Sequence, residues 1–275
     1  MSRAPAKPRP ASATRTATPA CTTDTRAPEA PVDQDDVTGL LRRTAEHLGH
    51  MLDAAFDTVE LVRQRTEAVL GTDRGATTRL ALTALHPLFR SVLAHQPNPL
   101  EGVGVAVGPG ALSDTERWLE WWRRGPDGAA SFTRHVLDPG ALGFYDYQSR
   151  PWFRTPLEAG HEVAVGPYLD AGGCDVYTTT LATPLVLGPG QDLVVGGDLD
   201  MARLEATFLR EVGRRRPAVA LLAASDRVVV SNTALLTSGS RVPATVKEAV
   251  QAEVAVPSRV PGRSSWRLVA LEQQP

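Results

Sequence analysis

Apolar residues recur every seven positions along residues 37–70, the first strongly patterned stretch of the chain. This period places them in one stripe along a long helix. Asp36 is suited to cap the start of the helix, as is its neighbour Asp35, and Gly71 is suited to end it. At 1.5 Å per residue the helix would run for about 50 Å, so it either packs lengthwise along its own domain or pairs with a second copy of the chain. The repeat comprises Leu41, Leu48, Ala55, Val62 and Val69.

Shorter segments that alternate apolar and polar residues follow the long helix and predict strands. Turn sequences rich in Gly, Pro and Asp separate these segments. Helices are expected at residues 77–94, with a break near Pro87, at residues 149–158 and at residues 201–210. This order of elements predicts an α+β fold in which a PAS-like, five-stranded antiparallel sheet follows the long helix. The strand-like segments are residues 102–107, 118–123, 131–137, 163–168, 174–185 and 193–197.

A smaller unit is predicted past Pro217. Residues 218–223 and 227–231 have the pattern of a hairpin. Residues 243–253 have the pattern of a helix, and residues 266–271 that of a final strand. We interpret this unit as a truncated second PAS-like lobe.

The chain therefore divides into three predicted parts. Residues 1–36 are rich in Ala, Pro, Thr and Arg and have no apolar period. Such a segment cannot bury enough surface to offset the entropy of ordering it, so we predict that it is disordered. Residues 37–212 are predicted to form a ligand-binding lobe that includes the long helix. Residues 213–275 are predicted to form a small α/β lobe.

Composition and charge narrow the classes of function. A formal net charge of -2 argues against a nucleic-acid surface, which needs clustered Lys and Arg. No apolar run reaches the roughly 18 residues that a membrane span needs, and no secretory signal opens the sequence. The two cysteines, Cys21 and Cys174, provide no disulfide framework, as is usual in a reducing compartment. We therefore expect a cytoplasmic protein that binds neither nucleic acid nor a membrane.

Six polar residues between positions 145 and 198 carry the groups needed to bind an amino acid. The planar guanidinium of Arg150 fits a carboxylate with two parallel hydrogen bonds, and an indole N–H and a phenol can face the same carboxylate. Two aspartates in one small cavity repel each other, and burial raises their pKa. We expect the ammonium group of a ligand to supply the cation that keeps both ionised, with a second phenol beside it. The residues are Tyr145, Arg150, Trp152, Tyr168, Asp170 and Asp198.

The spacing of these six residues resembles that of the amino-acid-binding subset of double-Cache sensor domains. Measured from Arg150, the pattern has tyrosine five residues before, tryptophan two after, tyrosine 18 after and aspartate 20 after, and Asp198 ends a later strand. The resemblance covers residues 102–200 and implies a Cache fold with an amino acid or related amine as ligand. Phe153 stands where that subset usually carries tyrosine. We place Phe153 and Tyr177 at the cavity wall, and we expect no metal and no cofactor.

Three functions remain open at this point. The first, which we predict, is a sensor that signals through a separately encoded regulator protein, with residues 37–70 as a homodimer interface. The second is an enzyme in which two carboxylates do acid–base work on a small zwitterion. Only His161 and Cys174 lie near the site, and the chain has no G-x-S-x-G, zinc spacing or phosphate loop, so we predict that it is not an enzyme. The third is a ligand-free dimerisation scaffold, which Phe153 favours.

Overall fold

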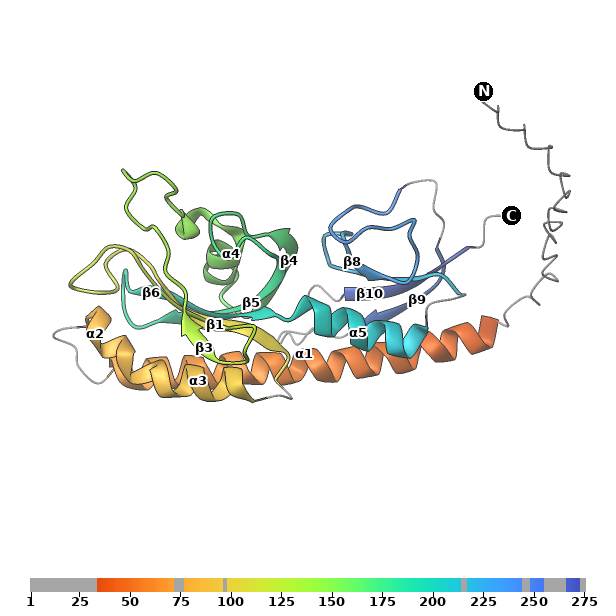
Figure 1. Cartoon of the computed structure of the whole chain (residues 1–275), viewed down its shortest axis with the longest axis horizontal. Coiled ribbons are helices and arrows are strands. Elements are labelled where there is room, and N and C mark those ends of the chain that lie inside the picture. The colour runs from red at the N-terminus through yellow and green to blue at the C-terminus, as the bar shows by residue number, and fades with distance from the viewer. Residues whose placement is uncertain are drawn as a thin grey trace, which may run out of the picture. The chain divides into compact units, whose positions relative to one another are not determined.

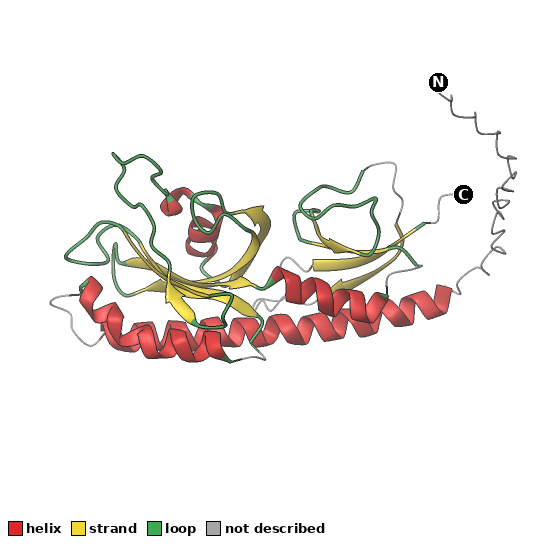
Figure 2. Cartoon of the chain, in the orientation of Figure 1, coloured by secondary structure: helices red, strands yellow, loops and turns green. Residues whose placement is uncertain are grey.

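The long helix predicted from the sevenfold repeat is present and extends from Gln34 to Gly71 (α1). It runs along two antiparallel sheets and contacts strands of both (Figures 1 and 2). Disorder was predicted over residues 1–36, but residues 34–36 belong to α1. The rest of that prediction lies outside the described residues. The structure is a computed structural model that describes residues 34–71, 77–95, 98–213, 217–243, 248–254 and 266–272.

The apolar stripe of α1 faces the interior of its own chain. Leu41, Leu48 and Val62 are all fully buried, and they belong to the same core as the sheet residues Val103 and Val195. Burying this stripe removes apolar area from water at about 25 cal/mol per Å². The stripe therefore stabilises the packing of α1 lengthwise along the sheets, and pairing of α1 with a second copy of the chain stays a prediction.

Six strands form the first sheet, in the order β3-β2-β1-β6-β5-β4, and every neighbouring pair is antiparallel. The sheet has six strands and not five because all six strand-like segments join it. β3 is a short edge strand that pairs with β2 through Phe132 and two preceding residues. The strands are β1 (Leu100–Val107), β2 (Trp118–Arg124), β3 (Ala130–Phe132), β4 (Val163–Leu169), β5 (Tyr177–Val186) and β6 (Asp192–Leu199).

Helices cover both faces of this sheet. The helix α1 and, after it, α2 (Arg79–Leu82), η1 (Thr83–Leu85) and α3 (His86–Ala94) belong to one side. Pro87 lies in the first turn of α3, where its missing N–H costs no helical hydrogen bond, so the predicted break is confirmed. The other face packs against η2 (Tyr147–Ser149) and α4 (Pro151–Ala159), which share a second apolar cluster with Leu119 and Ala182 (Figure 1).

The second sheet follows α5 (Met201–Val212), whose first turn is capped by the carboxylate of Asp200 accepting from the N–H of Arg203 at 2.9 Å. Its strand order is β8-β7-β10-β9. The predicted hairpin and final strand are confirmed. The division of the chain into separate domains at residue 212 stays a prediction. The strands are β7 (Val219–Leu222), β8 (Val228–Ser231), β9 (Glu248–Val254) and β10 (Trp266–Leu271).

The helix predicted over residues 243–253 is wrong, because residues 248–254 form the strand β9. In this segment Val250, Ala252 and Val254 alternate with polar residues, which fits a strand as well as a short helix. Antiparallel pairing with β10 decides between the two and places Val254 opposite Trp266. Residues 244–247 lie outside the described residues. No helix among the described residues is long and apolar enough to cross a membrane, and the cytoplasmic location stays a prediction.

Candidate functional site

On the face of the first sheet that packs against α4, three positions are glycine and carry no side chain. Gly104 of β1 and Gly196 of β6 are register partners. A Cβ atom on Gly104 would lie 2.6 Å from Cε3 of Trp121, and one on Gly196 would lie 3.1 Å from Cη2 of the same indole. The ring of Trp121 therefore lies close over the two glycines, an approach that only residues without a side chain allow. The third glycine is Gly102, two residues before Gly104 on β1.

Asp198, near the end of β6, is 4% exposed and accepts three hydrogen bonds on this face. Nε1 of Trp121 and Nη1 of Arg123 both donate to Oδ2 at 3.0 Å, and the hydroxyl of Thr180 donates to Oδ1 at 2.8 Å. All three partners are donors, which suits an ionised carboxylate because it can only accept. Burial raises the pKa of Asp198, and the charge of Arg123 opposes that rise.

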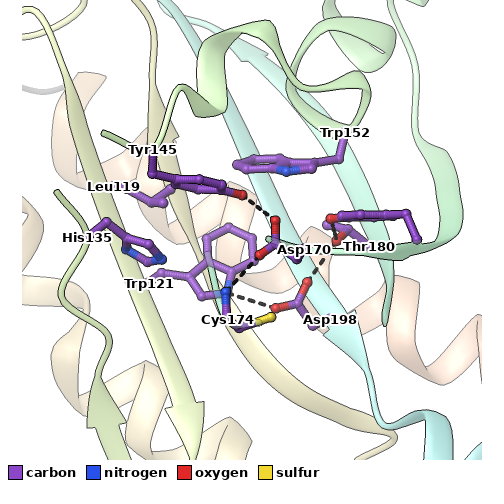
Figure 3. A pocket seen from close by; sticks show the side chains of 10 residues that line it. Leu119, Trp121, His135, Tyr145, Trp152, Asp170, Cys174, Thr180 and Asp198 are labelled. Atoms are coloured by element: carbon purple, nitrogen blue, oxygen red, sulfur yellow. Dashed lines mark hydrogen bonds between the residues drawn. The ribbon is translucent and has the colours of Figure 1, made fainter. Parts of the chain in front are cut away.

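The second acid, Asp170, follows β4 directly and is 8% exposed. The hydroxyl of Tyr145 donates to Oδ1 at 2.6 Å, and the backbone N–H of Cys174 donates to Oδ2 at 3.0 Å (Figure 3). Burial and the neighbouring Asp170 raise the pKa of Tyr145, so its phenol stays a donor at neutral pH. Tyr145 thus donates to an acid of its own chain, and contact of its phenol with a ligand carboxylate stays a prediction.

A chain of hydroxyl groups joins Tyr168 to the first acid. The hydroxyl of Tyr168 lies 2.7 Å from Oγ1 of Thr180. Thr180 has one hydroxyl proton and donates it to Asp198, so Tyr168 must donate to Thr180. Burial, with the nearby Asp198, raises the pKa of Tyr168 and keeps this donor protonated. The chain orients Thr180 and fixes one edge of the Asp198 carboxylate.

Both acids line one narrow cavity. Its volume is about 10 Å³, which is room for about one water molecule. Side chains of the strands β2, β5 and β6 and of the loop after β3 point toward this space (Figure 3). The lining residues are Leu119, Trp121, His135, Tyr145, Trp152, Tyr168, Asp170, Cys174, Thr180 and Asp198.

A second cavity of about 410 Å³ shares the side chains of Trp152 and Tyr168 with the first. Arg150 lines this larger cavity and not the narrow one. Its guanidinium lies 5.3 Å from the ring centroid of Tyr145 and donates through Nη2 to the carbonyl of Ala171 at 2.9 Å. The remaining wall comes from residues 164–169 of β4 and from the turn between β7 and β8.

Trp152 carries an unused donor between the two cavities. It is 3% exposed, and its buried Nε1 atom makes no well-formed hydrogen bond to a described residue, although it lies near enough to the Tyr145 hydroxyl to oppose the rise in the pKa of that phenol. Buried polar groups are nearly always hydrogen-bonded, so an unpaired indole N–H in a cavity wall indicates a place for an acceptor from outside the chain.

The structure thus gathers five of the predicted residues around one cavity and sets Arg150 at the next. Phe153 and Tyr177 line neither cavity. Phe153 packs edge-on against Tyr147 and Trp152 in the apolar cluster under α4. Tyr177 is 38% exposed at the start of β5. Contact of either residue with a ligand stays a prediction.

Sequence reasoning missed the residues that β2 contributes. It required a ligand to supply the cation beside the two acids, but Arg123 already supplies one to Asp198 at 3.0 Å. A signal was present, because Leu119, Trp121 and Arg123 alternate along β2 and therefore share one face. Nothing local in the sequence shows that this face meets Asp198, which is 75 residues further along the chain.

Neither a family model nor a curated protein sequence matches this chain. Solved structures do match it. The ligand-binding domain of the Pseudomonas aeruginosa amino acid chemoreceptor PctC, in complex with GABA, is 16% identical, with a TM-score of 0.53; the match covers 86% of this chain and 98% of that one. The corresponding domain of the Pseudomonas fluorescens chemoreceptor CtaA, in complex with L-valine, is 15% identical, with a TM-score of 0.55 and coverage of 88% and 98%.

A structure described as methyl-accepting chemotaxis protein X is 16% identical, with a TM-score of 0.57 and coverage of 86% and 98%. At these identities the likeness establishes the fold. The chain has the long-helix, two-sheet α+β fold of chemoreceptor ligand-binding domains, so the Cache-like fold predicted from the sequence is confirmed.

Proposed function

We propose that this protein is a sensor module that binds an amino acid or a related amine beneath α4 and signals through a separate partner protein. The observation that carries the proposal is the pair of buried carboxylates, Asp170 and Asp198, in one cavity wall with the unpaired indole N–H of Trp152. Acceptors at one end and a free donor at the other match the two ends of a zwitterion. The ligands named with the solved structures of the same fold, among them GABA and L-valine, support this ligand class.

The acid end has capacity left for an ammonium group. Two ionised carboxylates offer about eight acceptor positions. Within the chain Asp198 accepts three hydrogen bonds and Asp170 two from the groups described above, so about three positions remain. An ammonium group carries three N–H donors, and bonds between ionised partners are about twice as strong as neutral ones.

The carboxylate end is assigned to Trp152 and Arg150. A ligand carboxylate would accept from the buried, unpaired Nε1 of Trp152 and from the guanidinium of Arg150. One N–H of that guanidinium already donates to the carbonyl of Ala171. Arginine has five N–H donors, so enough remain for a two-pronged bond to a carboxylate.

An amino acid is larger than the narrow cavity, so the proposal requires the ligand to extend past Trp152 and Tyr168 into the larger one. We assign the ligand side chain to that larger space, whose wall includes Leu169 and Pro167 of β4. Binding then requires a small shift of the wall that Trp152 and Tyr168 share. The cavity size also places small amino acids and short amines among the first compounds to test.

A thermal-shift screen of the full chain against the twenty amino acids, GABA and simple amines tests the proposal. A compound at 100-fold its dissociation constant should add about 2.7 kcal/mol to the free energy of unfolding. Arg150→Ala should abolish the shift with little loss of stability, because Arg150 is only half-buried. Arg154→Ala is the matched control, since Arg154 is one turn further along α4 and is exposed at 61%.

The absence of a shift with every compound would reject amine sensing and favour the scaffold. Mass spectrometry of the bound compound after long incubation separates the sensor from an enzyme: the sensor returns it unchanged.

Pull-down from lysate with and without the bound compound tests the partner, and light scattering tests the homodimer through α1. The cytoplasmic location is tested by fractionation of cells that express the tagged chain.

A further inference from the structure

Arg123, Gly102, Asp198 and Thr180 lie in one row across four strands. Gly102 of β1 is the register partner of Arg123 on one side and of Asp198 on the other. Thr180 of β5 is in turn the partner of Asp198. Side chains in such a row point to the same face of the sheet. Arg123 and Asp198 are therefore separated by one strand, and the residue between them is a glycine.

The missing side chain at Gly102 is what lets the guanidinium of Arg123 reach the acid. Neighbouring strands lie about 4.8 Å apart, so the side chain has to cross roughly 10 Å over β1. A Cβ atom on Gly102 would lie 2.8 Å from Oδ2 of Asp198 and 3.4 Å from Cγ of Arg123. Any other residue at this position would stand in the path of the ion pair.

Arg123 is held from two sides, which fixes its position. Nη2 donates to Oε1 of Glu101 at 2.6 Å and Nη1 to Oδ2 of Asp198 at 3.0 Å, and the side chain of Arg123 is 17% exposed. Arg123 does not line the narrow cavity. Arg123 therefore makes no direct contact with a bound amine, and its hydrogen bond to the subsite is the one to Asp198.

We propose that Arg123 is a positioning residue of the ammonium subsite, which keeps Asp198 ionised and fixed in orientation before an amine binds. This inference rests on the proposed function for the ammonium itself, but its first half concerns the protein alone. An acid that is already ionised binds an amine without first releasing a proton. The affinity for the amine is then independent of pH over the range in which Asp198 stays charged.

The charges around Asp198 make Arg123 the decisive group. Burial raises the pKa of Asp198, and the neighbouring Asp170 raises it further. His135 is no substitute cation, because burial lowers its pKa from the ordinary value of 6.5. Among the titratable groups of the described residues that face Asp198, Arg123 is the cation, and without it the acid takes up a proton at higher pH. These groups are Glu101, Arg123, His135, Tyr145, Tyr168, Asp170 and Cys174.

The first experiment needs no ligand. A carbon-13 NMR titration of aspartate-labelled protein follows the Asp198 carboxyl, identified as the signal missing in Asp198→Asn. In Arg123→Met, which is neutral and of similar length, the midpoint should rise by at least about one pH unit, since one unit is a tenfold change in the protonation equilibrium. Arg123→Lys should keep the parent midpoint. Arg154→Met, a surface substitution, is the control. An unchanged midpoint in Arg123→Met would overturn the proposal.

The second experiment measures amine binding against pH by calorimetry, with GABA and L-alanine as probes. The dissociation constant of Arg123→Met should rise about tenfold per pH unit below its new midpoint and recover above it, whereas the parent and Arg123→Lys stay flat. Weakening by the same factor at every pH would contradict the proposal. If neither probe binds the parent, the proposed function fails for these ligands while the NMR titration still decides the role of Arg123.

Gly102→Ala provides a variant that keeps both charges. Its added Cβ atom separates the two groups of the ion pair, so the Asp198 midpoint should rise in the same direction as in Arg123→Met and by a smaller amount. This variant decides the proposal if Arg123→Met does not fold. A midpoint equal to that of the parent would show that Asp198 is ionised for another reason.

Discussion

The two sheets differ in what they bury. The second sheet packs aliphatic residues such as Leu221, Val228 and Leu268, all fully buried. The described residues that are both buried and polar all lie before residue 213, and the charged ones, Glu120, Asp170 and Asp198, sit on or beside the first sheet. Burying a charge costs free energy unless it is paired. Within the described residues the fold therefore accepts that cost in the first sheet alone, which is the sheet that carries the proposed site.

Glycine marks the same difference. The first sheet has glycines at Gly102, Gly104 and Gly196, where side chains on neighbouring strands reach across the backbone. The four strands of the second sheet contain none. A glycine inside a strand weakens the strand and creates space above it. In the first sheet, glycines reduce side-chain packing and leave room for polar groups. In the second sheet, apolar side chains fill the corresponding space.

Asp198→Asn should have the largest effect in the first sheet. It removes the charge that pairs with Arg123 and with an ammonium group, and it places an amide NH2 either against the donors of Trp121 and Arg123 or against the hydroxyl of Thr180. We expect the free energy of unfolding to fall by about 3 kcal/mol, at the lower end for a broken buried pair because Glu101 still binds Arg123. Binding of every amine should be lost. Urea unfolding and calorimetry measure the two effects, with Asp192→Asn at the other end of β6 as the control.

Leu221→Ala tests the second sheet. Leu221 is 0% exposed in the central strand β7, and its truncation should cost roughly 2–5 kcal/mol through lost burial and the cavity that it leaves. The stability that a bound amine adds should match that of the parent, because Leu221 lines neither cavity. Urea unfolding with and without a compound from the screen makes the comparison. Loss of the ligand-induced increase would mean that both sheets build the site.

Cys174 provides the smallest and most local effect. Burial raises the pKa of its thiol to about 12, so little of the reactive thiolate is present at neutral pH. In a Cys21→Ser background, alkylation of Cys174 by iodoacetamide at pH 8 should be at least about 100-fold slower than in the unfolded chain. A bound amine should slow it further, because Cys174 lines the narrow cavity. Equal rates in the folded and unfolded chain would contradict the burial of this side of the site.

Much of the fold follows from local pattern. The sevenfold stripe predicts α1, alternation predicts the strands of the first sheet, and Pro87 marks the break before α3. The helix predicted for the segment that forms β9 was wrong, because a short run of alternating small apolar residues fits both a helix and a strand. Pairing with β10 settles the choice through backbone hydrogen bonds that no local window contains.

For the site, spacing along the chain identified Tyr168, Asp170 and Asp198, which meet around one cavity. The same reasoning missed the hydrogen bond from Tyr145 to Asp170 and left the acids without a cation from the protein. Leu119 and Trp121 of β2 line the cavity and Arg123 reaches Asp198, but the six-residue pattern begins at Tyr145 and includes none of the three. Their role depends on register, and a slip of one residue would turn Arg123 to the other face of the sheet.

By itself the sequence determined most of the helices and strands, β9 excepted, and named five polar residues that line one cavity, because those properties depend on period and residue type. Only the tertiary structure decided that Arg123 reaches Asp198 over Gly102, and that Arg150 lies at the neighbouring cavity. Such contacts depend on hydrogen-bonded register between strands far apart in the chain, and their free energy exists only once the strands are paired.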